Sequence, residues 1–108
     1  MRYLPHEEMR VLVLNTKSEV TANLCLYRGT VDTTVLRVAE ILRPAIVRNC
    51  PKIVLCHNHP SGDSAASPED IHVTEQVVAA GEILDIEVLD HIIVGNPHYT
   101  SLKELLKW

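Results

Sequence analysis

The chain has 108 residues, which is enough for one compact domain and argues against two. Hydrophobic residues make up 46% and charged residues 22%, a balance that excludes a chain disordered throughout. The formal net charge of −4 argues against a surface that binds nucleic acid by neutralising phosphates. No apolar run approaches the ~20 residues that cross a bilayer, so we expect no membrane segment.

The N-terminal segment and the cysteines indicate the compartment. The first ten residues are rich in charge and lack the apolar stretch of a signal peptide. The three cysteines, Cys25, Cys50 and Cys56, are odd in number and show no CxxC spacing. A disulfide framework is therefore not expected, and the sequence predicts a cytoplasmic protein.

The first half of the chain predicts a hairpin and a helix. Residues 9–14 form a short apolar run, and apolar residues alternate with polar ones over residues 20–29, so we expect two antiparallel strands joined by the turn-like segment NTKS. Residues 35–49 carry apolar side chains at helical spacing. Pro44 lies inside this stretch and should kink the helix or limit its regular part.

The second half begins with a strand and a helix. The apolar segment IVLC, residues 53–56, predicts a central buried strand that ends in the polar loop HNHPSGDSAAS. A helix is predicted over residues 68–84. Its start is well specified, with Ser67 as N-cap, Pro68 in the first helical position and Asp70 in the third.

The rest of the chain predicts a strand over residues 86–94 and a short final helix capped by Thr100 or Ser101. The order of the predicted elements is typical of a mixed β-sheet flanked by helices, in the α/β class. We expect a single domain over residues 1–108.

His57 and His59 stand where the predicted strand 53–56 ends. Residues two apart on an extended segment point to the same side, so both imidazoles can converge on one ion, and Asp70 in the first turn of the next helix can add a carboxylate. Two nitrogens and one oxygen, with a fourth position for water, are typical of a catalytic zinc site. Alternatively, the histidines are ordinary loop residues, and Asp70 is the third residue of a capping box with Ser67.

The stretch HNHPSGDSAASPED reads H-x-H-P, six residues, then S-x-x-D. It resembles the metal motif of the JAMM (JAB/MPN+) metalloproteases at every defined position. The segment HNHPSGD, together with RGT at 28–30 and LDHIIVG at 89–95, resembles the RadC-like branch of this superfamily. The resemblance extends from about Glu7 to Ser101. It implies a JAB/MPN-type, cytidine-deaminase-like three-layer fold and a zinc-dependent metallopeptidase or isopeptidase.

The resemblance also implies roles for individual residues. It makes His57, His59 and Asp70 ligands of Zn²⁺. It makes Ser67, otherwise only a helix cap, a hydrogen-bond donor to the bound water or to the developing oxyanion. Zinc in such a site lowers the pKa of its bound water to about 7.

The resemblance further implies a glutamate near the start of an early strand, which accepts the water's proton and delivers it to the leaving amine. Glu7 or Glu8 must fill this place, and only one can face the metal because side chains alternate along a strand. The family order of Glu, any residue and a large apolar residue fits Glu7–Glu8–Met9 and selects Glu7. Alternatively, both glutamates form a solvated charge pair.

Several other polar residues receive structural interpretations. Cys56 alternates to the face opposite His57 and is expected to be a buried thiol. Asp90 and His91 lie in a predicted strand, where we favour a structural role over a role beside the metal. Asn58 should point away from the two histidines and hold the loop through its amide. The remaining histidines are expected at the surface: His6, His72 and His98.

The resemblance also bears on functions other than amide hydrolysis. The RadC-like name is attached to DNA repair, which implies an indirect link to DNA metabolism, and we expect no helix-hairpin-helix region such as precedes this domain in longer family members. MPN domains without the metal motif act as interaction platforms, so a non-catalytic or weakly catalytic interaction module is the alternative function. A zinc deaminase is excluded because H-x-E and P-C-x-x-C are absent. The expected partner is a peptide, isopeptide or other amide substrate.

Overall fold

The computed structural model describes residues 1, 3–29 and 37–108. In chain order, its elements are β1 (Glu7–Leu14), β2 (Val20–Gly29), α1 (Val38–Arg48), β3 (Lys52–Asn58), α2 (Pro68–Leu84), β4 (Glu87–Val94), β5 (Tyr99–Ser101) and α3 (Leu102–Leu106). The strands form one sheet in the order β2-β1-β3-β4-β5. This architecture confirms the predicted mixed sheet flanked by helices.

The predicted hairpin is present, since β1 and β2 pair antiparallel. Its turn is held by Asn15, whose side-chain oxygen accepts the backbone N–H groups of Lys17 and Glu19 at 2.9 and 3.0 Å. This is the local bonding that favours asparagine in turns. β1 begins at Glu7, two residues earlier than the sequence predicts, so the candidate base lies inside a strand.

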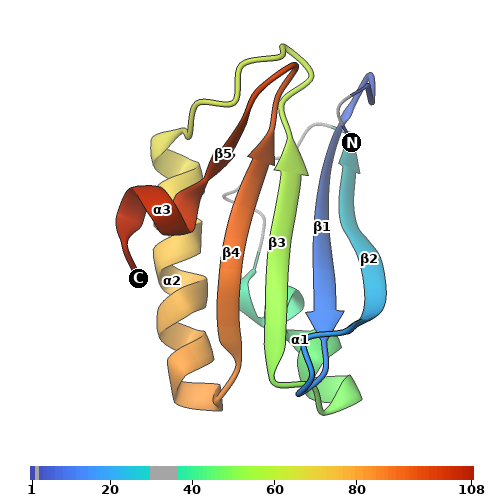
Figure 1. Cartoon of the computed structure of the whole chain (residues 1–108), viewed down its shortest axis with the longest axis vertical. Helices are drawn as coiled ribbons and strands as arrows, with labels where there is room; N and C mark the ends of the chain where they lie inside the picture. Colours follow the sequence, from blue (N-terminus) through green and yellow to red (C-terminus); the bar gives the residue numbers. More distant parts are fainter. Residues whose placement is uncertain (2, 30–36) are drawn as a thin grey trace.

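Both long helices pack on the same face of the sheet. The core between them consists of inward-facing residues of β1, β3 and β4 together with one stripe of each helix; from the strands it takes Val11, Val13, Ile53, Leu55 and Val88, and from the helices Ile41, Leu42, Ala45, Val73 and Val77. The remaining helix, α3, lies beside β4 and β5 at the edge of the sheet (Figure 1).

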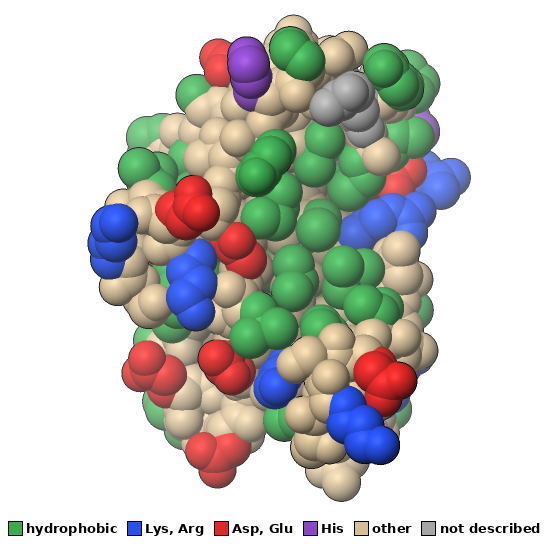
Figure 2. All heavy atoms as spheres, in the orientation of Figure 1, with side chains coloured by type: hydrophobic (Ala, Val, Ile, Leu, Met, Phe, Trp, Pro, Cys, Tyr) green, Lys and Arg blue, Asp and Glu red, His purple; other side chains and the backbone are tan. Residues whose placement is uncertain are grey.

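The other face of the sheet carries no helix among the described residues, and we call it the open face (Figure 1). The described part of the chain therefore has two layers where the resemblance implied three. Apolar side chains run across the middle of this face (Figure 2). Pairing and alternation place Leu12 and Cys56 on it, opposite in direction to the core residues Val11 and Leu55.

The helix and strand ends differ in part from the predictions. The first helix is described from Val38, and the predicted start at Val35 lies outside the described residues, as does Thr30 of the RGT segment. The helix continues through Pro44 to Arg48. Ser101, rather than Thr100, caps the final helix. The three-residue strand β5 was not predicted, because so short a segment shows no periodicity.

The topology brings four segments to one end of the sheet. β3 runs parallel to β4 and antiparallel to β1, so the ends of β3 and β4 meet the beginning of β1. The loop of residues 59–67 then leads over this edge into the N-terminus of α2 (Figure 1, top). Among the described residues, no helix is both long and apolar enough to cross a membrane.

Candidate metal centre

Two imidazoles and one carboxylate converge at this end of the sheet. The Nε2 atoms of His57 and His59 lie 2.9 Å apart. Each Nε2 atom also lies 3.5 Å from an oxygen of Asp70, Oδ1 for His57 and Oδ2 for His59. The potential ligand atoms of the three residues all lie within 4.8 Å of one another, so the predicted residues form a group that could hold a metal ion.

The distances fit a single small ion. Ligands at 2.0–2.1 Å from a tetrahedral zinc lie about 3.3 Å from one another, and the observed contacts of 2.9 and 3.5 Å bracket this value. His57 and Asp70 are buried, whereas His59 is half-buried. The centre is thus enclosed by protein on one side and accessible on the side of His59, as a site that receives a substrate requires.

The predicted capping box holds Asp70 in place. The backbone N–H of Asp70 donates to Oγ of Ser67 at 3.1 Å, and the backbone N–H of Ser67 donates to Oδ2 of Asp70 at 2.9 Å. The cap and ligand interpretations of Asp70 are therefore compatible, because the bond from Ser67 orients the carboxylate without neutralising it. The cap bond uses a lone pair of the Ser67 hydroxyl and does not use its proton.

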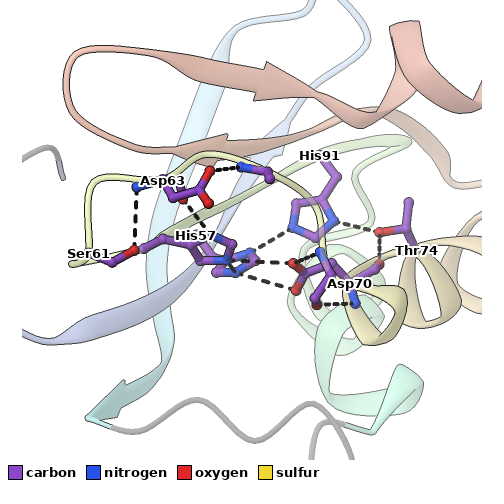
Figure 3. A network of polar contacts seen from close by, with 9 residues as sticks. His57, Ser61, Asp63, Asp70, Thr74 and His91 are labelled. Carbon is purple, nitrogen blue, oxygen red and sulfur yellow. Dashed lines mark hydrogen bonds and ion pairs between the residues drawn. The ribbon is translucent and has the colours of Figure 1, made fainter.

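His59 is oriented by the loop that follows it. Its Nδ1 atom lies 2.8 Å from the backbone oxygen of Asp63, and the side chain of Asp63 in turn accepts the backbone N–H of Ala65 at 2.9 Å. Figure 3 shows Asp63 on the loop beside the histidines. Since a carbonyl oxygen only accepts, Nδ1 of His59 is the donor, and Nε2 is the atom directed to His57 and Asp70.

His57 has a partner that sequence reasoning did not assign to the site. Its Nδ1 atom lies 3.2 Å from Nε2 of His91, and Nδ1 of His91 lies 2.6 Å from the hydroxyl of Thr74. Figure 3 shows these side chains in a row between β3, β4 and α2. The sequence favours a structural role for His91, and the structure places this residue in direct contact with the candidate ligand His57.

Burial changes the protonation of both rings. It lowers the pKa of His57 from 6.5 to about 4, although the nearby carboxylate of Asp70 acts in the opposite direction. It also lowers the pKa of His91, which has no exposed surface, to about 3. Near neutral pH both rings are therefore uncharged, which is the form in which histidine binds a metal.

The two glutamates of β1 lie on opposite faces of the sheet. Met9 pairs with His57 on the helix-covered face, and alternation places Glu7 on that same face, toward the candidate metal centre. Glu8 is buried on the open face. Its carboxylate accepts hydrogen bonds from His6 at 3.0 Å and Arg10 at 2.8 Å. The alternative interpretation of a solvated charge pair is therefore wrong for Glu8, which is buried.

Asn58 points away from the histidines, as predicted, and its contacts differ from the predicted ones. Its side-chain oxygen accepts the backbone N–H of Glu8 at 2.7 Å, and its amide donates to the backbone oxygen of His6 at 2.9 Å. The Asn58 side chain therefore forms hydrogen bonds with the backbone on both sides of Glu7 instead of with the loop that follows it. The middle residue of the HNH segment thus ties the start of β1 to the end of β3.

The remaining predicted residues have structural surroundings. Asp90 accepts hydrogen bonds from the hydroxyl of Ser101 at 2.7 Å and from the backbone of Lys103 at 3.1 Å, which confirms its structural role. Cys56 lies on the open face, half-buried, and burial raises the pKa of its thiol. His72 and His98 are exposed as expected, whereas His6 is half-buried against Glu8.

Comparison with known proteins identifies the family. The family model described as RadC-like JAB domain matches residues 1–107. Proteins named UPF0758 are 46% identical in Chloroflexus aggregans and 42% identical in Roseiflexus castenholzii and Clostridium botulinum, each over 104 residues or 96% of this chain. The chain spans 45–46% of the length of these relatives. The chain belongs to the RadC-like JAB domain family.

Proposed function

We propose that this domain is a zinc-dependent hydrolase of amide bonds, with His57, His59 and Asp70 as the zinc ligands. The observation that carries the proposal is the convergence of their ligand atoms at one end of the sheet. Zinc bound there supplies a nucleophile at neutral pH by lowering the pKa of its water, and it polarises the carbonyl of the substrate. Two nitrogens and one oxygen leave a position for these groups.

Glu7 and Ser67 are the candidates for proton transfer and charge stabilisation. Glu7 shares the face of β1 that looks toward the centre, so its carboxylate would accept a proton from the attacking water and return it to the leaving amine. Ser67 accepts the cap bond from Asp70 and keeps its hydroxyl proton, which it would donate to the developing oxyanion. Such a donor contributes about 3 kcal/mol to transition-state stabilisation.

The proposed substrate is a peptide, an isopeptide or another amide, and the proposed compartment is the cytoplasm. An indirect link to DNA metabolism is proposed from the resemblance to RadC-like domains, whose name is attached to DNA repair. A second candidate function, an interaction module, is favoured by the apolar open face (Figure 2). The two functions make different demands on the metal centre, since only the hydrolase needs it.

The test begins with metal content after purification without added metal. We expect about one zinc per chain in the wild type, and none in His57→Ala or Asp70→Ala. Hydrolysis is then followed as new amino groups released from a mixture of unfolded polypeptides. Glu7→Gln should keep the zinc and lose hydrolysis by 10²- to 10⁴-fold. A wild type that takes up no zinc, or hydrolyses as fast without it, would refute the proposal and favour the interaction module.

A further inference from the structure

The hydroxyl of Thr74 joins two parts of the centre. Thr74 lies in α2 one turn after Asp70, and its Oγ1 atom lies 2.6 Å from the backbone oxygen of Asp70 and 2.6 Å from Nδ1 of His91 (Figure 3). A hydroxyl has one proton to donate, and a carbonyl oxygen can only accept. The Thr74 proton therefore goes to Asp70, and the second contact is a hydrogen bond donated by Nδ1–H of His91.

This assignment determines where the ring protons of His91 and His57 lie. A neutral imidazole carries a single ring proton, and both of these rings are buried. With its proton on Nδ1, His91 presents a lone pair on Nε2, 3.2 Å from Nδ1 of His57. His57 must then donate from Nδ1. Its Nε2 atom is left unprotonated and faces the centre.

The loop after His59 favours the same tautomer, with the ring proton on Nδ1. Its Nδ1 donates to the backbone oxygen of Asp63 at 2.8 Å, so its Nε2 atom is also unprotonated in the neutral ring. The two Nε2 atoms, 2.9 Å apart, then have no proton between them, and the carboxylate of Asp70 lies 3.5 Å from each. These lone pairs repel one another unless a cation lies among them.

We propose that Thr74 and His91 are positioning residues that preset His57, before any ion arrives, in the tautomer that binds a metal. This inference rests on the proposed zinc site and adds how the site is prepared. Hydrogen bonds run from His57 to His91 to Thr74 and end on the backbone of Asp70, so the helix that supplies one ligand also selects the tautomer of another. Such supporting partners typically contribute 10- to 100-fold in metal affinity.

The test observes tautomers and affinity separately. The two ring nitrogens of each histidine are distinguished by ¹⁵N NMR in the metal-free protein, and zinc affinity is measured by competition with a chelator. We expect the Nδ1–H tautomer at His57 and His91 in the wild type. In Thr74→Val, Nδ1–H of His91 loses its acceptor, both rings should shift to the Nε2–H tautomer, and zinc affinity should fall about 10- to 100-fold.

Two further variants serve as controls. Thr74→Ser keeps the hydroxyl and should restore both the tautomers and the affinity. Thr21→Val removes another hydroxyl that donates to a backbone oxygen, at 3.1 Å from Val13, and should change neither.

Each outcome decides between the two proposals. An Nε2–H tautomer at His57 in the wild type would overturn the inference. This measurement does not depend on whether any variant folds. Zinc affinity that is the same in Thr74→Val and in the wild type would overturn it as well, while leaving the zinc site intact. A wild type with the expected tautomers and no zinc binding would refute the zinc site, and with it the purpose assigned to Thr74 and His91.

Discussion

Two buried carboxylates lie at the same end of the sheet on opposite faces, and their surroundings differ in charge. On the open face, Glu8 meets the guanidinium groups of Arg10 at 2.8 Å and Arg28 at 3.5 Å. The hydrogen bond from His6 and these two cations hold the pKa of Glu8 below its ordinary value. On the helix-covered face, the carboxylate of Asp70 lies 3.5 Å from two imidazoles, of which the buried His57 is uncharged near neutral pH.

Two carboxylates with similar burial therefore differ in whether their charge is balanced by neighbouring cations. The charge of Glu8 is balanced within the protein by His6, Arg10 and Arg28, so this cluster needs no added cation. The carboxylate of Asp70 is held by the backbone of Ser67 and lies 3.5 Å from two imidazole nitrogens, so the cluster on the helix-covered face could hold an added cation.

Removing the charge of Asp70 should have the largest effect. In Asp70→Asn the amide oxygen can still accept the backbone N–H of Ser67, so the helix cap and the fold should persist. Zinc affinity should fall by more than about 100-fold, which exceeds the loss typical of a supporting partner. Chelator competition measures this loss. Glu69→Gln, one residue away and exposed, is the matched control and should bind zinc like the wild type.

Lowering the pH should reduce the free energy of unfolding in two ranges, one set by the buried histidines of the helix-covered face and a more acidic one set by Glu8 of the open face. The pKa of His57 and of His91 is lowered in the folded state, so between 6.5 and about 4 the unfolded chain binds protons that the folded zinc-free protein does not. Stability is then complete above 6.5 and falls with pH, by up to roughly 1.4 kcal/mol per pH unit for each ring. Urea unfolding at a series of pH values measures this slope.

Two variants test which residues cause the slope of stability against pH. His72→Gln removes an exposed histidine and should leave the slope unchanged. Glu8 has a lowered pKa, so its contribution is present above 4.5 and is lost only as pH falls below that value; Glu8→Gln should remove only this more acidic part. Stability that does not change between pH 6.5 and 4 would contradict the uncharged state of the buried histidines.

Asn58→Ala should loosen the beginning of β1. The substitution leaves the backbone N–H of Glu8 without the acceptor it has at 2.7 Å, and a buried donor left unpaired costs about 1–3 kcal/mol. Amide hydrogen exchange of Glu8 should accelerate, while zinc affinity changes little because the ligands remain. Asn23→Ala is the matched control, since Asn23 bonds to Arg10 at an exposed position. An unchanged amide exchange rate at Glu8 would contradict the role of the Asn58 side chain in holding the beginning of β1.

Cys56→Ser should have the smallest effect. The thiol is adjacent in sequence to His57, yet it lies on the open face and its pKa is raised by burial. Zinc affinity should therefore remain within about 2-fold of the wild type, because only deprotonated thiols bind zinc well. A large loss of zinc in Cys56→Ser would mean that the chain uses a sulfur ligand instead of the convergent histidines.

The convergence of His57, His59 and Asp70 could be predicted from the sequence because their geometry is local. His57 and His59 share a face through the alternation of a strand, and the capping box alone places Asp70 in the first turn of α2. The placement of Glu7 and Glu8 on opposite faces follows from alternation along β1 and its pairing with β3. Each of these relations spans few residues or follows from one strand pairing.

His91 and Thr74 could not be found in this way, because their contact depends on the register between distant strands. β3 and β4 shift register between Ile53 and Val54, which leaves Leu89 unpaired and places both Val88 and His91 on the helix-covered face. Alternation counted from Val88 would have turned His91 to the open face. A bulge of this kind leaves no clear signal in the sequence, so the partner of His57 becomes visible only in the folded sheet.

Zinc K-edge X-ray absorption on the zinc-loaded wild type identifies the atoms that bind the ion. With His57, His59 and Asp70 as ligands, we expect a first coordination shell of nitrogen and oxygen only, with the outer-shell scattering of about two imidazoles. Sulfur at about 2.3 Å would show that a cysteine holds the ion. That result, or a protein that retains no zinc, would contradict the claim that His57, His59 and Asp70 form a metal centre.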